Sequence, residues 1–320
     1  MRASNHALRA FAILTILGVP GCMPTEVDYM PSSDVQGDCI TKNENLRIRS
    51  ATDARSLPEQ CFSVNGTVEV LDSDLTDLEA LRYLRRANGL VIKDNPQLLS
   101  LAGLDHVSVS KEIWVASNPE LGDLDGLDGT EEVAEVKIER NPALVTIAGL
   151  RSLRVVGDGG LTVVDNGGLT DLAELDRLER VGRLKVSNNR GMTALKLKVH
   201  AVAGDVEVSD NPDLNQIAGF ANLETVGGNF LLERNTSLGV TNGFTAKFRT
   251  VGGNLSIDGN PSLTDIYELA VNLYAVGGSV IATNNTSLSQ CRAEDLDFYL
   301  EEIGGLIDIG DNGVEWDPCH

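Results

Sequence analysis

The residues that could do chemistry in this chain are clustered carboxylates and four histidines. The run D-L-D-G-L-D-G brings Asp123, Asp125 and Asp128 close together, and carboxylate oxygens are ligands that Ca²⁺ prefers. Their spacing does not match the EF-hand loop, so a solvated acidic turn and an ion site are both open at this point. No G-x-S-x-G, H-E-x-x-H or phosphate-loop pattern is present. We therefore expect no enzymatic activity, no bound cofactor and no metal-binding residues. The histidines lie far apart in the chain, at His6, His106, His200 and His320.

One polar residue recurs at a constant place in a V-x-V-x-x-N-x-x-L unit. Successive asparagines are separated by 23, 23, 25, 23, 22, 24, 25, 25 and 27 residues. A period in the low twenties is typical of a solenoid, in which each repeat is one coil stacked on the next. Asparagine both donates and accepts hydrogen bonds, so we expect a buried structural ladder that satisfies backbone groups of the turns. Its members are Asn95, Asn118, Asn141, Asn166, Asn189, Asn211, Asn235, Asn260, Asn285 and Asn312.

Each coil is expected to hold a short strand before the asparagine and a turning apolar segment after it. In the coil at 90–104, alternation directs Leu90 and Ile92 inward and Val91 and Lys93 outward. Leucines then recur every three residues, which sends three side chains inward from a segment that is not a strand. Proline follows several of the asparagines, where it is expected to end the strand because it cannot donate to a ladder.

Glycine pairs and helical spacing mark other parts of the coils. The glycine pairs precede strands, and we expect them to supply backbone angles closed to other residues. Leu296, Leu300 and Ile303 have helical spacing, as do Leu81 and Leu84, so some returns are expected to be short helices. The coil at 227–251 is the least regular, and we expect a bulge there. The glycine pairs stand at 227–228, 252–253, 277–278 and 304–305.

Outward-facing strand residues should form columns along the sheet, and one column contains a tryptophan. Four residues before the first three ladder asparagines stand Val91, Trp114 and Lys137. Tryptophan is a common anchor at protein interfaces, so these three residues form the candidate interface. The alternative is that Trp114 only packs on its neighbours in the column.

The repeats resemble the receptor L domain, a leucine-rich-repeat-like solenoid found in the extracellular halves of insulin and epidermal growth factor receptors. The resemblance is carried by G-G-N-L-S-I-D-G-N-P-S-L at 252–263 and its echoes at 227–238 and 277–288, and it covers about 62–312. It implies a right-handed stack of coils with parallel sheets, and a role in protein binding or cell-surface organisation. Signalling is not implied, because no kinase or cysteine-rich module accompanies the repeats. We expect a β solenoid of about eleven coils with short helical returns and disulfide caps.

The N-terminal segment is typical of an export signal. Two arginines precede an apolar run at 10–19, which is too short to span a bilayer. The following V-P-G-C resembles a bacterial lipobox and implies lipid on Cys22, a signal peptide at 1–21 and a flexible tether at 22–38. We expect an outer-membrane lipoprotein of the cell envelope, periplasmic or displayed on the surface. The alternatives are a cleaved secretory signal, which would give a secreted protein, and a membrane anchor.

The remaining four cysteines lie outside the regular repeats, two at each end. Both ends of a solenoid expose an apolar coil that needs a cap. Pairing Cys39 with Cys61 and Cys291 with Cys319 places one disulfide in each cap, whereas the other pairings would join opposite ends of a rod about 50 Å long. The expected divisions are an N-terminal cap at 39–62, the repeats at 63–290 and a C-terminal cap at 291–320.

Composition limits the partners and the core. The formal charge of -21 repels phosphate backbones and anionic head groups, so we expect no nucleic-acid partner and membrane contact through the lipid alone. Aromatic residues are only 4% of the chain, so the core is expected to be leucine, valine and isoleucine. We expect a non-enzymatic lipoprotein that binds a protein or other cell-surface ligand. The alternatives are a structural protein of the envelope and a glycan-binding protein.

Overall fold

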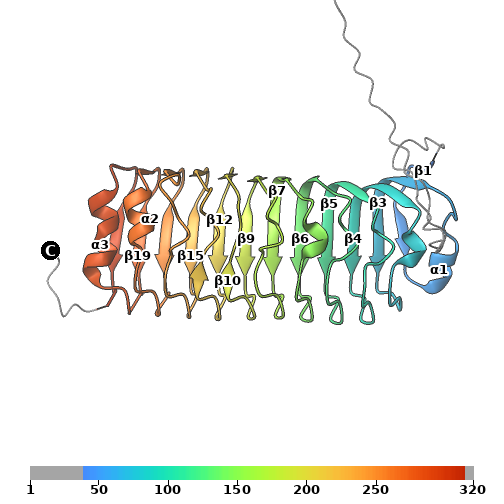
Figure 1. Cartoon of the computed structure of the whole chain (residues 1–320), viewed down its shortest axis with the longest axis horizontal. Coiled ribbons are helices and arrows are strands. Elements are labelled where there is room, and N and C mark those ends of the chain that lie inside the picture. The colour runs from blue at the N-terminus through green and yellow to red at the C-terminus, as the bar shows by residue number, and fades with distance from the viewer. Residues whose placement is uncertain (1–38, 314–320) are drawn as a thin grey trace, which may run out of the picture. The chain divides into compact units, whose positions relative to one another are not determined.

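The computed structural model describes residues 39–313, and these form a parallel β-solenoid of about twelve turns with few helices (Figure 1). The β solenoid expected from the asparagine period is therefore confirmed. The turns stack in one row, from α1 (Ala51–Arg55) at the N-terminal end to α3 (Gln290–Tyr299) at the C-terminal end. Each turn adds one long strand or two short strands to a continuous parallel sheet along the stack.

In the N-terminal half, the first turn places two three-residue strands in this sheet, and each later turn places one long strand. Its neighbours are the preceding and following turns, and every pairing is parallel. Two single-turn 3-10 helices, η1 (Glu79–Leu81) and η2 (Ala148–Leu150), lie in the returns. The strands of this half are β1 (Ile40–Lys42), β2 (Leu46–Ile48), β3 (Phe62–Leu71), β4 (Leu84–Lys93), β5 (Ser108–Ala116), β6 (Glu132–Glu139) and β7 (Val155–Val164).

In the C-terminal half, each turn carries a two-residue strand, a bend and then a four-residue strand. The two-residue strands are β8 (Arg180–Val181), β11 (Ala201–Val202), β14 (Thr225–Val226), β16 (Thr250–Val251), β18 (Ala275–Val276) and β20 (Glu302–Ile303). The longer ones are β9 (Leu184–Ser187), β12 (Val206–Ser209), β15 (Phe230–Glu233), β17 (Leu255–Asp258), β19 (Val280–Thr283) and β21 (Ile307–Gly310). β10 (Ala194–Leu195) and β13 (Gln216–Ile217) pair on the return side, and α2 (Tyr267–Asn272) lies in a later return.

The register between turns builds the core as straight columns. Leu90 pairs with Ile113, which pairs with Val136, and the column continues to Val280 with every member at most 1% exposed. The return segments close the core from the other side: Leu98, Leu101 and Leu104 are all fully buried. Burial of apolar surface stabilises a fold by about 25 cal/mol per Å². Because every turn buries such surface, this core is the main source of stability.

Phenylalanines also enter the core, which differs from the expected aliphatic composition. Phe220, Phe230, Phe244 and Phe248 are each at most 2% exposed, and their rings contact one another with centroids 5.2–6.2 Å apart. The return of this turn places the smaller Thr241 inside, 2% exposed, where other turns place a larger apolar residue.

The strands end at a left-handed residue, and proline has a smaller part in this than expected. β4 stops at Lys93, and Asp94 then has φ 56°, before Asn95 and Pro96 are reached. The residue before each ladder asparagine, and the one before Ser73 at the equivalent place in an earlier turn, share this conformation, which aspartate, asparagine and glycine tolerate best. These residues are Asp72, Asp94, Ser117, Arg140, Asp165, Asn188, Asp210, Arg234, Gly259, Asn284 and Asp311.

The paired glycines have a different role from the one expected. Positive φ angles occur at Gly103, Gly126, Gly160 and Gly259 among the described glycines, and none of these belongs to the four pairs at 227–228, 252–253, 277–278 and 304–305. The paired positions need glycine because the backbones of adjacent turns lie too close together there for a side chain. A Cβ on Gly253 would lie 2.6 Å from Oδ1 of Asn229 and 2.9 Å from its backbone nitrogen, closer than van der Waals contact allows.

The N-terminal cap contains a further turn of the solenoid, which raises the number of turns from the expected eleven to about twelve. β1 and β2 both pair in parallel with β3, with Ile40 opposite Phe62 and Leu46 opposite Val68. A disulfide joins Cys39 to Cys61, 22 residues apart, at equivalent places in adjacent turns. The bond therefore ties the first turn to the second. The second expected disulfide, between Cys291 and Cys319, includes Cys319, which lies outside the described residues.

Helices and bulges correct two further expectations. Leu296 lies in α3, whose N-cap Ser289 accepts a hydrogen bond from the backbone N–H of Arg292. The helix ends before the rest of the expected pattern, because Leu300 is its C-cap and Ile303 belongs to β20. Leu81 ends the three-residue η1 and Leu84 begins β4, so no longer helix forms there. The register shifts of the long sheet lie in the pairings of β3–β4, β4–β5 and β6–β7, whereas β15 in the coil at 227–251 pairs regularly on both sides.

Candidate functional site

The recurring asparagines form a continuous buried ladder between the strands and the returns. The Oδ1 of Asn141 accepts from the backbone N–H and the Nδ2 of Asn118, at 3.1 and 3.2 Å. Its Nδ2 donates to the carbonyl of Val115 at 3.1 Å and to Oδ1 of Asn166 at 3.2 Å. Nine of the ten ladder asparagines are 0% exposed, and Asn312 is half-buried at the end of the stack. Each side chain joins three turns, which is a structural function.

Ser73 begins this ladder in place of an asparagine. Its backbone N–H and its hydroxyl donate to Oδ1 of Asn95, at 3.0 and 2.7 Å. At the opposite end, the backbone N–H and Nδ2 of Asn285 donate to Oδ1 of Asn312. Every ladder oxygen in residues 39–313 thus accepts two hydrogen bonds from the preceding turn, which is the pattern that keeps buried polar groups satisfied.

Trp114 on β5 lies half-buried on the outer face of the sheet, between cations from both neighbouring strands. Its Nε1 donates to Oε2 of Glu139 at 3.1 Å. Nζ of Lys93 stands 3.8 Å from the ring centroid and Nζ of Lys137 stands 5.2 Å away. A cation over an indole face is attracted by the ring quadrupole. The ring therefore packs on its column neighbours and still presents part of its surface.

Lys137 is held in its charged form by two carboxylates. Its Nζ lies 2.8 Å from Glu135 and 3.6 Å from Glu112. Burial alone would lower the pKa of Lys137, but the hydrogen bonds and attraction of Glu135 and Glu112 outweigh it and raise the pKa. Val91, the third residue of the candidate interface, is half-buried beside Trp114 and opposite it in the register. The structure thus brings the three candidate residues together on adjacent strands.

Small outward residues are covered by their longer neighbours. Ala116, Ser187, Ser209 and Ser256 face outward by register but are at most 8% exposed. The accessible outer face is therefore formed by the long side chains between them.

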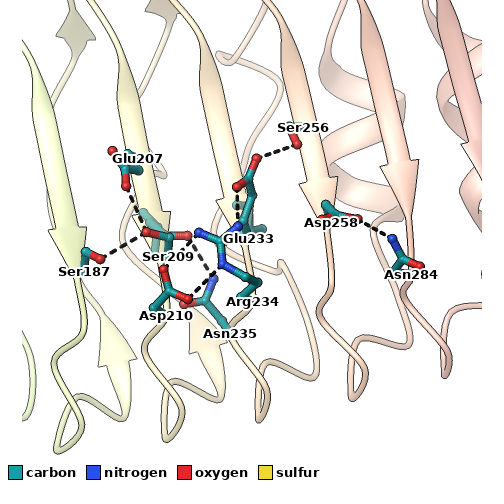
Figure 2. Close-up of polar contacts among 12 residues, drawn as sticks. Ser187, Glu207, Ser209, Asp210, Glu233, Arg234, Asn235, Ser256, Asp258 and Asn284 are labelled. Carbon is teal, nitrogen blue, oxygen red and sulfur yellow. Dashed lines mark hydrogen bonds and ion pairs between the residues drawn. The ribbon is translucent and has the colours of Figure 1, made fainter.

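Toward the C-terminal end, the outer face is a network of paired charges (Figure 2). Arg234 donates through Nε and Nη2 to the two carboxylate oxygens of Asp210, at 2.8 and 2.9 Å, and through Nη1 to Glu233 at 2.7 Å. The hydrogen bond from Arg234 lowers the pKa of Asp210. Ser256 donates to the second oxygen of Glu233 at 2.8 Å. Because these charges are satisfied within the chain, this part of the sheet offers fewer free groups to a partner.

The acidic run at 123–129 forms a repeated turn. Oδ1 of Asp123 accepts from the backbone N–H of Asp125 at 3.1 Å, and Asp128 pairs with Arg151 at 2.8 Å. The same side-chain turn is made by Ser100 in the preceding return and by Thr146 in the following one. Within residues 39–313, no group of three or more histidine, cysteine, aspartate or glutamate side chains is arranged to hold a metal ion. Turn formation accounts for Asp123.

Replacing Asp125 with Asn is expected to stabilise the protein slightly at neutral pH. Burial first, and then the nearby Asp123 and Asp128, raise the pKa of Asp125. A raised carboxyl pKa means that the folded state disfavours the carboxylate, so removing the charge adds stability at pH 7. The gain should be within about 0.5 kcal/mol for an exposed side chain, and should vanish below about pH 3.9, where aspartate is protonated in both states.

Thermal melts of wild type and Asp125→Asn at pH 7 and pH 3 measure this difference. Glu120→Gln, an exposed carboxylate just before the cluster, is the matched control for loss of one charge. If Asp125→Asn melts at a lower temperature than wild type only when Ca²⁺ is added, the Asp125 carboxylate binds the ion.

The residues on which the lipoprotein prediction depends lie outside the described part of the chain. This applies to Cys22, the signal peptide at 1–21 and the tether at 22–38. No helix within residues 39–313 has the length and apolarity needed to cross a membrane. Comparison with known proteins found no matching family model, no similar curated protein and no similar solved structure.

Proposed function

We propose that this chain is a non-enzymatic binding protein of the cell envelope, which recognises a protein partner through the outer face of its long sheet. The export signal and the lipobox-like V-P-G-C sequence support the location, and Cys22 would carry the lipid. The parallel solenoid supports the mode of action, because stacked turns present an extended surface of regularly spaced side chains.

The observation that carries the proposal is the setting of Trp114. The indole is half-buried, and its orientation is held by Glu139, Lys93 and Lys137 before any partner arrives. A pre-oriented aromatic ring loses little conformational entropy on binding, which favours it as an interface anchor. The apolar Val91 lies directly beside it in the register and extends the contact surface.

The second candidate is a structural rod that spaces components of the envelope. The unbroken asparagine ladder and the continuous core support it, because both link every turn to its neighbours. In this case Trp114 would contribute only to packing. The resemblance to receptor L domains is compatible with either function and is part of this proposal, as are the right-handed coil and a second disulfide in the C-terminal cap.

Replacing Trp114 with Ala separates the two candidates. Loss of the cation–π contacts and of one partly buried hydrogen bond should cost about 1–2 kcal/mol, so the protein should stay folded. If the rod binds through this face, cross-linking and mass spectrometry on intact cells should recover a partner with wild type and lose it with Trp114→Ala. The matched control is Ile281→Ala, a half-buried residue of the same outer column seven turns away.

An identical set of cross-linked proteins for wild type and Trp114→Ala would contradict the binding proposal and favour the structural rod. Loss of folding in the variant would show that the ring belongs to the core. A thermal melt of each purified variant distinguishes that outcome from loss of the interface.

A further inference from the structure

One turn of this acidic solenoid is strongly basic. Residues 177–200 contain seven lysines and arginines and a single acidic residue, a formal charge of +6 within a chain of charge -21. Two of the seven are neutralised locally, since Lys185 pairs with Glu207 and Lys196 pairs with Asp171. Arg177, Arg180 and Lys198 are exposed and form no ion pair with any residue in 39–313. Their charge is available to a ligand.

These cations gather along one edge of the stack, where the returns lead into the strands. The backbone N–H of Glu179 donates to the carbonyl of Arg154, and that of His200 donates to the carbonyl of Glu179, both at 2.9 Å. The three residues therefore lie in consecutive turns. A surface hollow at this edge is lined by Arg154, Arg177, Lys198 and His200, together with Asp176 and Glu179. Arg154 already neutralises Glu179 at 3.0 Å, which leaves the hollow cationic.

The edge continues beyond the hollow as a row. Asn222 lines the hollow beside Lys198, and in the next turn Lys247 donates to Oδ1 of Asn222 at 3.0 Å. Arg177, Lys198, Asn222 and Lys247 thus occupy four consecutive turns. With strands about 4.8 Å apart, this row extends for about 15 Å. It is one side chain wide in each turn.

The shape of this row selects among anionic partners. A bilayer or duplex DNA is broad, and its charges would meet the carboxylates that make the rest of the protein acidic. A flexible single-stranded nucleic acid needs aromatic side chains for base stacking, and none of Phe, Tyr or Trp lines the hollow. A thin linear chain with regularly spaced anionic groups fits both the width and the length. We propose that this edge binds an acidic polysaccharide, independently of the protein-binding face.

The test uses the full chain with two probes: fluorescent heparin, which carries sulfates, and fluorescent polygalacturonate, which carries carboxylates. Replacing Arg177 and Lys198 together with Gln removes two unpaired cations of the hollow. Binding of either probe should weaken at least about tenfold at 0.1 M salt, and the slope of log K against log salt should fall by about two. Thermal melts should stay unchanged, because both side chains are exposed.

The matched control is Arg190→Gln, which removes an exposed, unpaired arginine of the same turn on the far side of the ladder residue Asn189. Its affinity for the probes should stay within about twofold of wild type, because it contributes no contact. Equal losses in R190Q and R177Q/K198Q, or no binding of either probe by wild type, would overturn the proposal. Tighter binding to phosphatidylglycerol vesicles or to a single-stranded DNA oligonucleotide than to both polysaccharides would overturn the assignment of the ligand.

Discussion

Asn141→Ala should unfold at much lower denaturant than wild type, with a loss of about 4 kcal/mol in the free energy of unfolding. The substitution leaves the carbonyl of Val115 and the backbone N–H of Asn118 without the partners that they have at 3.1 Å. Each such buried group costs about 1–3 kcal/mol when it is stranded away from water. The side chain also joins three successive turns, so its loss weakens two interfaces between turns at once.

Equilibrium unfolding in urea, followed by circular dichroism, measures this effect. Asn88→Ala is the chemical control, because Asn88 is only half-buried and lies outside the ladder. Asn312→Ala is the positional control, because Asn312 is half-buried at the end of the ladder, where water can reach the groups that it leaves. Both controls should lose less than half as much stability as Asn141→Ala. A curve for Asn141→Ala that overlies wild type would mean that the ladder is dispensable.

Phe230→Ala should destabilise the protein by about 4 kcal/mol, through the cavity left in the core. Phe230 is 1% exposed, and its ring contacts those of Phe220, Phe244 and Phe248 at centroid distances of 6.2, 5.7 and 5.8 Å. These four are most of the seven phenylalanines in the chain, so the surrounding turns cannot replace the lost contacts with another ring. Thermal and urea unfolding of the purified variant measure the loss.

Phe230→Leu is the graded control, because the same core column holds Val206 and Leu255 in the adjacent turns. Leucine should recover more than half of the stability, since it fits the column and leaves a smaller cavity. Leu99→Ala removes an apolar side chain that is 56% exposed and should change stability by at most about 0.5 kcal/mol. Equal stability of Phe230→Ala and Leu99→Ala would show that the aromatic cluster contributes nothing to the fold.

The candidate site could be predicted only in part. Register counting from the asparagine placed Val91, Trp114 and Lys137 in one outward column, because parallel turns repeat at the same offset. It could not show that Glu139 accepts from the indole or that Lys93 covers the ring, since both depend on rotamers of side chains in three different turns. The basic edge was missed, although a count of charges turn by turn finds residues 177–200 directly.

Backbone corrections have a similar origin. The paired glycines look like turn residues in the sequence, but their small size is needed because the next turn lies against them, as Asn229 does against Gly253. The left-handed residue before each ladder asparagine carries a sequence signal of its own, the frequent aspartate, asparagine or glycine at that place. Arg140 and Arg234 adopt the same conformation although arginine does not favour it, so residue type alone would not predict it at these two positions.

By itself, the sequence determined the solenoid, the order of its strands and the direction of each core side chain. This was possible because the ladder asparagine occupies the same place in every turn, so one period of 22 to 27 residues sets the register of the strands that lead into it. Tertiary structure alone decided which outward side chains became neighbours, which small ones were covered and where unpaired cations gathered. Those contacts join residues one turn or more apart, and they depend on the length and rotamer of each side chain, which the repeat does not specify.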